Sequence, residues 1–135
     1  MNRLRRVLLV LLFILISFAV SGCFPGMPSQ ITVVDDKGRA LYVEQTPKRV
    51  VSLAPSCTEI LFSLELDESV VGVTADCDYP EAAKTKPKVG RYFATTLEAI
   101  LAANPDIILT DGYDPVVPQL EPTGVPFLVL QPKDI

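Results

Sequence analysis

RVVSLAPSCTEILFSL, residues 49–64, is the stretch that decides the fold, because it contains a buried strand and the helix that this strand leads into. Residues 50–53 form a short β-branched and apolar run, which is typical of a strand covered on both faces. A Pro-Ser turn follows, where Ser56 or Thr58 can accept hydrogen bonds from the free N–H groups of a first helical turn. We therefore predict a strand–helix unit here. Such units occur both with and without a ligand at the turn.

The predicted helix has apolar residues at helical spacing. Ile60, Leu61 and Leu64 form its expected buried stripe, and Glu59 lies near the helix start, where a carboxylate suits the helix dipole. The rest of the chain repeats this plan. We expect strands at residues 70–74, 106–110 and 125–130, a helix at 96–103 capped by Thr95 or Thr96, and weaker helical turns at 79–84 and 116–120.

Alternating strands and helices predict the α/β class, with a Rossmann-like parallel sheet flanked by helices. Before it, residues 31–43 contain two β-prone runs around a Gly-containing turn, which predicts an N-terminal β-hairpin packed against the sheet edge. Ligands of such sheets bind beyond the carboxyl ends of the strands. The loops expected there are residues 56–58, 75–79 and 111–114.

The N-terminus has the organisation of a targeting segment. Residues 1–22 combine a basic start, an apolar run and small residues before Cys23. The motif Val20-Ser21-Gly22-Cys23 resembles a bacterial lipobox, which implies cleavage before Cys23 and lipid attachment to its sulfur. A cleaved signal peptide with a chance cysteine, and an uncleaved anchor helix, are the alternatives. The Pro-, Gly- and Ser-containing residues 23–30 then predict a flexible tether.

Charge and composition exclude several classes of function. Removing residues 1–22 leaves 135 − 22 = 113 residues, enough for one modest domain, with a net charge of (12 − 3) − 16 = −7. This charge argues against nucleic acid and against a polybasic membrane surface as partners. The chain has no histidine. Catalytic Ser-His or Cys-His pairs and histidine metal sites are therefore excluded, and we expect no metal site or cofactor.

Six motifs in order carry a resemblance to a known family. They are RVVSLAPSxTEILF (49–62), VGVT (71–74), CDYP (77–80), KVG (88–90), LExI (97–100) and NPDIIL (104–109). Together they resemble the amino-terminal lobe of cobalamin- and iron-siderophore-type periplasmic binding proteins. The resemblance covers residues 31–135, so that this range is expected to form one lobe.

The resemblance implies a substrate-binding lipoprotein of an ABC importer, held outside the cytoplasm by its lipid. Its expected partners are cobalamin or a ferric siderophore, the permease subunits and the membrane. The family has two lobes joined by a long helix, with the ligand between them. This sequence stops at Ile135, where the connecting helix would begin. We therefore expect the second lobe to be absent and binding by this chain alone to be weak.

The resemblance also assigns roles to individual residues. Glu98 falls on the carboxylate that docks the lobe to an arginine of the permease. The expected ligand contacts lie in the post-strand loops and in the segment after KVG. They are Asp76, Arg91, Tyr92, Phe93 and Tyr113. Aromatic faces suit a large conjugated ligand, and Arg91 suits the carboxylates of a ferric chelate. The alternatives are a solvated Glu98 and aromatic residues that anchor the loop.

Cysteine and aspartate positions allow two further hypotheses. Cys57 and Cys77 follow the first two parallel strands, so we predict a disulfide between them, with two buried thiols as the alternative. Four aspartates in the post-strand loops could suggest calcium, but they lack a regular oxygen-ligand spacing and are interpreted as solvated turn residues. They are Asp76, Asp78, Asp111 and Asp114.

An enzyme is not expected, because the sequence has neither a Gly-rich phosphate loop after a strand nor a Cys-x-x-Cys motif. The alternative to transport is a surface interaction lipoprotein, or an inactive fragment, derived from a binding protein. Pull-down against a permease, compared with ligand titration, would distinguish this alternative from a transport protein.

Overall fold

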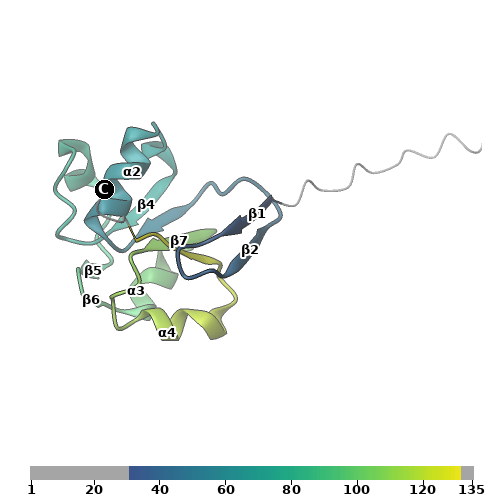
Figure 1. Cartoon of the computed structure of the whole chain (residues 1–135). Helices are drawn as coiled ribbons and strands as arrows, with labels where there is room; N and C mark the ends of the chain where they lie inside the picture. Colours follow the sequence, from purple (N-terminus) through teal and green to yellow (C-terminus); the bar gives the residue numbers. More distant parts are fainter. Residues whose placement is uncertain (1–30, 132–135) are drawn as a thin grey trace, which may run out of the picture.

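The computed structural model describes residues 31–131, which form an α/β fold around a four-stranded parallel sheet (Figure 1). The sheet order is β4-β3-β7-β8, and the strands are Val70–Val73, Val50–Ser52, Ile107–Thr110 and Phe127–Val129. The predicted fold class is confirmed. The predicted leader, the tether and Cys23 lie outside the described residues. Within residues 31–131, no helix is long and apolar enough to cross a membrane.

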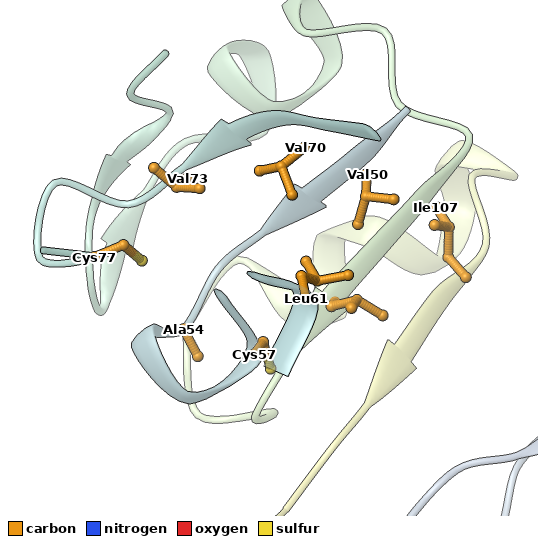
Figure 2. Packing of buried hydrophobic residues seen from close by; sticks show 9 residues of the cluster. Val50, Ala54, Cys57, Leu61, Val70, Val73, Cys77 and Ile107 are labelled. Atoms are coloured by element: carbon orange, nitrogen blue, oxygen red, sulfur yellow. The ribbon is translucent and has the colours of Figure 1, made fainter. Parts of the chain in front are cut away.

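Alternate residues of each strand point to opposite faces of the sheet, and each face carries its own apolar cluster. Helix α2 (Pro55–Ser63) covers one face, while α3 (Leu97–Ala102) and α4 (Val117–Leu120) cover the other (Figure 1). The cluster on the α2 face is drawn in Figure 2 and consists of Val50, Ala54, Cys57, Leu61, Val70, Val73, Cys77, Ile107 and Leu109. The other cluster consists of Val51, Leu53, Val89, Ile100, Ile108, Val116, Leu120, Phe127 and Val129.

The short elements connect these layers. Three 3-10 helices, η1, η2 and η3, span Asp67–Ser69, Glu81–Thr85 and Glu121–Thr123, and two short antiparallel strands, β5 and β6, span Gly90–Arg91 and Ala94–Thr95. The predicted strands and helical turns are confirmed with bounds that differ by no more than two residues at each end. Pro118 and Pro122 lie in α4 and η3, and helix α4 has only four residues.

The start of α2 corrects the prediction for the first helix. The helix begins at Pro55 after Ala54, and no side chain caps it. The Thr58 hydroxyl instead donates to the Ser52 hydroxyl at 2.8 Å, inside the core. Proline suits the first helical position because it has no N–H to satisfy there. The first turn therefore contains neither the predicted cap nor an acidic residue.

The buried stripe of α2 also differs from the predicted one. Leu61 is buried, but Ile60 and Leu64 are exposed, and Cys57 and Thr58 take their place on the buried face. Cys57 and Leu61 are separated by four residues and so lie on one face of the helix. Cys57 and Thr58 were not predicted as core residues, because the predicted stripe contained only large apolar side chains.

Helix α3 follows the prediction closely. Thr96 is its N-cap and accepts a hydrogen bond from the Ala99 N–H at 3.3 Å. At the other end, the Arg49 guanidinium donates to the carbonyl oxygens of Ala103 at 2.6 Å and Asn104 at 2.7 Å. A cation that binds the last carbonyl groups stabilises a helix C-terminus. Arg49 thus fixes α3 to the start of β3.

The N-terminal hairpin pairs β1 (Ile31–Val34) with β2 (Ala40–Val43) in antiparallel register. Its turn packs against β8, the edge strand of the sheet, as predicted. The Asp36 N–H donates to the Val129 carbonyl at 3.1 Å, and the Arg39 guanidinium lies 4.2 Å from the centre of the Phe127 ring. The hairpin therefore covers the β8 edge.

Asp35 holds the hairpin turn together, and its replacement by Asn should be destabilising. Its carboxylate, which is almost fully buried, accepts hydrogen bonds from the Lys37 and Arg39 backbone N–H groups and from the Arg39 guanidinium at 2.7 Å. Burial alone would raise the pKa of Asp35, but the hydrogen bonds from Arg39 outweigh it and hold the pKa below 3.8. We expect Asp35→Asn to lower the free energy of unfolding by about 2 kcal/mol, the value of a charge-assisted hydrogen bond.

The same carboxylate predicts a pH dependence. Because the folded pKa lies below the unfolded one, the unfolded state binds the proton more readily, and stability falls as the pH falls below about 4. Urea unfolding at pH 7 and pH 3 measures this. The difference in stability between the wild type and Asp35→Asn should shrink at pH 3, and a difference that does not change with pH would contradict the assignment.

Candidate functional site: the carboxyl edge of the sheet

The carboxyl ends of the parallel strands lie at one edge of the sheet, and the loops that follow them bring the predicted ligand residues together. Asp76 follows β4, Asp111 and Tyr113 follow β7, and Gln131 follows β8. The small β5–β6 hairpin joins them because the Ala75 N–H donates to the Gly90 carbonyl at 2.8 Å. The predicted site is therefore a single edge of the sheet.

Gly90 allows the β5–β6 hairpin to fold tightly. Its φ of +133° is a conformation that other residues rarely adopt, and a Cβ atom there would lie 2.8 Å from the Thr95 Cα. The chain then reverses over two residues, Tyr92 and Phe93. Phe93 has a φ of +60°, a strained value for an aromatic residue.

Tyr92 is bound to two other loops of the edge. Its backbone N–H donates to Asp76 Oδ2 at 2.8 Å, and its hydroxyl donates to Asp111 Oδ2 in a short hydrogen bond. Burial, together with the bond to Asp111, raises the pKa of Tyr92 to about 12. The ring centres of Tyr92 and Phe93 are 3.9 Å apart, with the planes tilted by 41°.

The predicted ligand residues differ in how freely they face solvent. Phe93 is 50% exposed and Tyr113 is 63% exposed, so both rings are available for contact. The Arg91 guanidinium is also exposed and lies 3.6 Å from the Asp76 carboxylate. An ion pair this exposed contributes little to stability, which leaves Arg91 available to an anionic group. Tyr92 is half-buried, and its hydroxyl is already paired.

The interpretation of the aspartates as solvated turn residues is wrong for two of them. Asp111 is 6% exposed and Asp114 is 2% exposed, whereas Asp76 and Asp78 are exposed. The Asp114 carboxylate accepts from the Val116 N–H and from the Thr95 hydroxyl, both at 2.9 Å. The carboxylates of Asp111 and Asp114 thus organise the loop after β7. In the described part of the chain, no group of acidic, cysteine or histidine residues could hold a metal ion.

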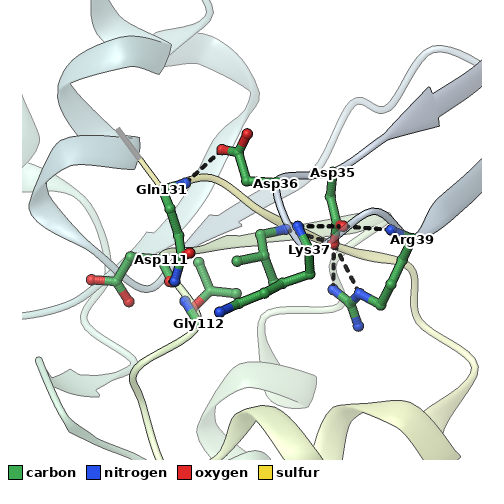
Figure 3. Close-up of polar contacts among 9 residues, drawn as sticks. Asp35, Asp36, Lys37, Arg39, Asp111, Gly112 and Gln131 are labelled. Atoms are coloured by element: carbon green, nitrogen blue, oxygen red, sulfur yellow. Dashed lines mark hydrogen bonds and ion pairs between the residues drawn. The ribbon is translucent and has the colours of Figure 1, made fainter. Parts of the chain in front are cut away.

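Gln131 and Asp36, which were not predicted as site residues, extend this network (Figure 3). The Gln131 backbone N–H donates to Asp36 Oδ2 at 2.7 Å, and its side-chain amide donates to the Asp111 carbonyl at 3.0 Å. Asp36 lies 95 positions away from Gln131 along the chain. The hairpin turn, the loop after β7 and the end of β8 are therefore connected.

The predicted disulfide is not formed, because Cys57 and Cys77 are both free, buried thiols. The sulfur of Cys77 lies 3.1 Å from the hydroxyl oxygens of Thr58 and Thr74. Burial raises the pKa of Cys57 to about 12, so its thiol stays protonated at neutral pH and is a poor nucleophile for disulfide formation. Cys57 and Cys77 were expected to lie close together, and they do belong to the same core cluster (Figure 2).

Two concave regions lie elsewhere on the molecule. A groove of about 520 Å³ lies between residues 42–48 and the segment around Asp106, and a smaller one of about 270 Å³ lies between the hairpin and the start of β8. Neither contains a predicted ligand residue. Asp106 comes directly before β7, so the larger groove is near the amino ends of the strands. We place the candidate site at the carboxyl edge, because the exposed aromatic rings and the Arg91 guanidinium lie in the loops of that edge.

Glu98 lies in the first turn of α3 and is exposed. It forms no ion pair with any of residues 31–131. Docking requires an exposed carboxylate, but a solvated residue that favours the helix N-terminus is exposed in the same way. Its role therefore stays a prediction.

The described residues form a parallel sheet flanked by helices, which is the architecture predicted for one lobe of a two-lobe binding protein. Comparison with known sequences agrees, because the family described as periplasmic binding protein matches residues 50–133. The chain belongs to this family, as the sequence motifs predicted.

The relatives of this chain include proteins that are named for tetrapyrrole ligands. A vitamin B12-binding protein of Yersinia pestis (strain Pestoides F) is 39% identical over 94 residues, which are 67% of this chain and 34% of that protein. A solved periplasmic heme-binding protein from Pseudomonas aeruginosa is 36% identical with a TM-score of 0.58, over 63% of this chain and 32% of the other.

A solved periplasmic vitamin B12-binding protein of Vibrio cholerae is 29% identical with a TM-score of 0.57, over 62% of this chain and 34% of the other. The solved neighbours are two-lobe periplasmic binding proteins, and this chain covers part of one of them. The chain spans about one third of the length of the curated relatives that it matches.

Proposed function

We propose that this chain is the substrate-binding component of an ABC importer for cobalamin, a ferric siderophore or a related metal chelate. The observation that carries the proposal is the family match over residues 50–133, combined with two exposed aromatic rings at the carboxyl edge. The relatives of this chain are named as binding proteins for vitamin B12 and heme. Binding and delivery, rather than catalysis, are the functions of such proteins.

In this proposal the lobe supplies one wall of the ligand site. Phe93 and Tyr113 offer flat apolar faces to a large conjugated ligand, and Arg91 offers a cation to its acidic groups. Neither of the two grooves described above is lined by these side chains. Ligand sites usually bury most of the ligand surface, so the opposite wall is expected to come from a second lobe.

The aromatic wall predicts that Phe93→Ala weakens ligand binding. We expect the dissociation constant for hemin or cyanocobalamin to rise about tenfold, which corresponds to about 1.4 kcal/mol for the loss of an aromatic contact. Absorbance titration of the full chain in detergent measures it. Tyr42→Ala is the matched control, because Tyr42 is also exposed but lines the distant groove. Equal losses in the two variants would contradict a ligand site at the carboxyl edge.

We further propose that Cys23 carries a lipid that anchors the protein outside the cytoplasm, a proposal supported by the lipobox-like Val20-Ser21-Gly22-Cys23. A diacylated cysteine supplies a hydrophobic anchor without a membrane-spanning helix. Cys23→Ser should abolish labelling by a radioactive fatty acid and leave unprocessed precursor. Cys57→Ser is the control, because it keeps the lipobox, and label retained in Cys23→Ser would refute the anchor.

A further inference from the structure

Asp111 is a buried carboxylate at the ligand edge, and neutral donors surround it. Its Oδ2 accepts from the Tyr92 hydroxyl, and its Oδ1 accepts from the Tyr113 backbone N–H at 3.1 Å. No lysine or arginine within residues 31–131 forms an ion pair with it. A buried carboxylate is costly unless it is well hydrogen-bonded. The Asp111 carboxylate therefore depends on hydrogen bonds from Tyr92 and Tyr113. In turn, it positions the Tyr92 hydroxyl and the Tyr113 backbone.

The loop held by Tyr92 is also strained. Phe93, the next residue, has a φ of +60°, and its side chain is half exposed instead of buried in the core. Such backbone conformations persist only where the surrounding contacts enforce them. Two sets of contacts act on this turn: the β5–β6 pairing on either side of it, and the two hydrogen bonds of Tyr92, from its N–H to Asp76 and from its hydroxyl to Asp111.

We propose that Asp111 is a positioning residue for the ligand surface: by holding the Tyr92 hydroxyl, it fixes the Phe93 ring in the orientation that faces the ligand. The proposal rests on the proposed function. It changes the roles expected from the sequence, because Tyr92 and Asp76 act through Phe93 instead of touching the ligand with their polar groups. Preorganisation of this kind raises affinity because less conformational freedom is lost on binding.

The structure separates this role from a general contribution to folding. The backbone of Asp111 is held independently of its carboxylate, because the Gln131 side chain donates to the Asp111 carbonyl. The preceding strand, β7, is paired with β3 and β8 on its two sides. Tyr92→Phe removes only the hydroxyl and leaves the ring contact with Phe93 in place. Tyr92→Phe and Asp111→Ala should therefore loosen the loop without unfolding the lobe.

Backbone ¹⁵N relaxation of the ligand-free full chain in detergent tests the proposal directly. For residues 91–93, we expect order parameters of about 0.85 in the wild type and below about 0.6 in both Tyr92→Phe and Asp111→Ala. Tyr42→Phe is the matched control, since it removes an exposed tyrosine hydroxyl from the hairpin. Unchanged order parameters in Tyr92→Phe would overturn the proposal, even if Asp111→Ala did not fold.

Ligand affinity provides the second readout. We expect Tyr92→Phe and Asp111→Ala each to weaken hemin or cyanocobalamin binding about fivefold to tenfold, and the double variant to weaken it no further, because the two residues act as one unit. Additive losses would contradict the coupling. If the wild type binds neither ligand, the proposed function fails, while the order parameters still decide the positioning role.

The ionisation of Tyr92 reports on the same pair without any ligand. Among the four tyrosines, Tyr92 should titrate with a pKa of about 12 in the wild type. Asp111→Ala should return it toward 10.0, the ordinary value, because the hydrogen-bond acceptor and its charge are removed. Carbon-13 NMR of ring-labelled tyrosine follows this titration. A Tyr92 pKa that is the same in both proteins would show that Asp111 does not hold the hydroxyl.

Discussion

Glu98→Ala should weaken association with the importer's permease by about 30-fold or more while leaving the lobe folded. Removing one partner of a charge pair that becomes buried on docking costs about 2 to 5 kcal/mol, and 1.4 kcal/mol corresponds to a factor of ten. Glu98 suits such a role because it is exposed in the first turn of α3 and pairs with no cation in the described part of the chain. Its loss should cost the helix only about 0.3 to 1 kcal/mol, through the dipole.

The affinity of the full chain for the reconstituted permease measures this effect, with thermal unfolding recorded in parallel. Glu59→Ala is the control, since Glu59 is also exposed on a helix but lies on α2. The docking role predicts a large loss for Glu98→Ala and almost none for Glu59→Ala. If both variants bind the permease as the wild type does, Glu98 is a solvated surface residue and docking occurs elsewhere.

The positions of the strands in the parallel sheet could be predicted from the sequence, because local chemistry determines them. The β-branched runs of β3 and β7 are buried on both faces, as parallel strands require. Helix α3 was placed by Thr96, whose side chain acts within three residues of its own position. Signals of this kind are complete within a short window.

The site could be predicted only as a set of loops. Its residues were named from the resemblance to the family, but the roles of those residues depend on partners far along the chain. The Tyr92 hydroxyl pairs with Asp111, 19 residues away, and Gln131 pairs with Asp36, 95 residues away. Loop aspartates are usually solvated, so the burial of Asp111 required knowledge of these partners.

The prediction for the start of the first helix was wrong for a related reason. Serine and threonine after a strand usually indicate a cap, but here Pro55 begins the helix and Thr58 turns inward to the Ser52 hydroxyl. The packing against β3 outweighed the local capping preference. Cys57 and Cys77 were expected to bond as a pair, yet both are accommodated as small buried thiols of the core.

The largest effect on ligand binding should come from supplying a second lobe. In the proposed site the described residues offer one wall, on which Phe93 and Tyr113 are exposed. Covering about 200 Å² more of an apolar ligand contributes about 5 kcal/mol at about 25 cal/mol per Å². Part of this is lost in closing the two lobes together. We therefore expect affinity for cobalamin or a ferric chelate to rise at least about 100-fold, or about 2.7 kcal/mol.

Calorimetric titration of cyanocobalamin and hemin tests the central claim, that this chain forms one wall of a ligand site shared between two lobes. The two proteins to compare are this chain and the same chain fused to the second lobe of a family member. We expect weak binding of at least one ligand by the chain and binding at least about 100-fold tighter by the fusion, with Phe93→Ala weakening both. Equally tight binding by the two proteins would show that this lobe carries the whole site and would contradict the account.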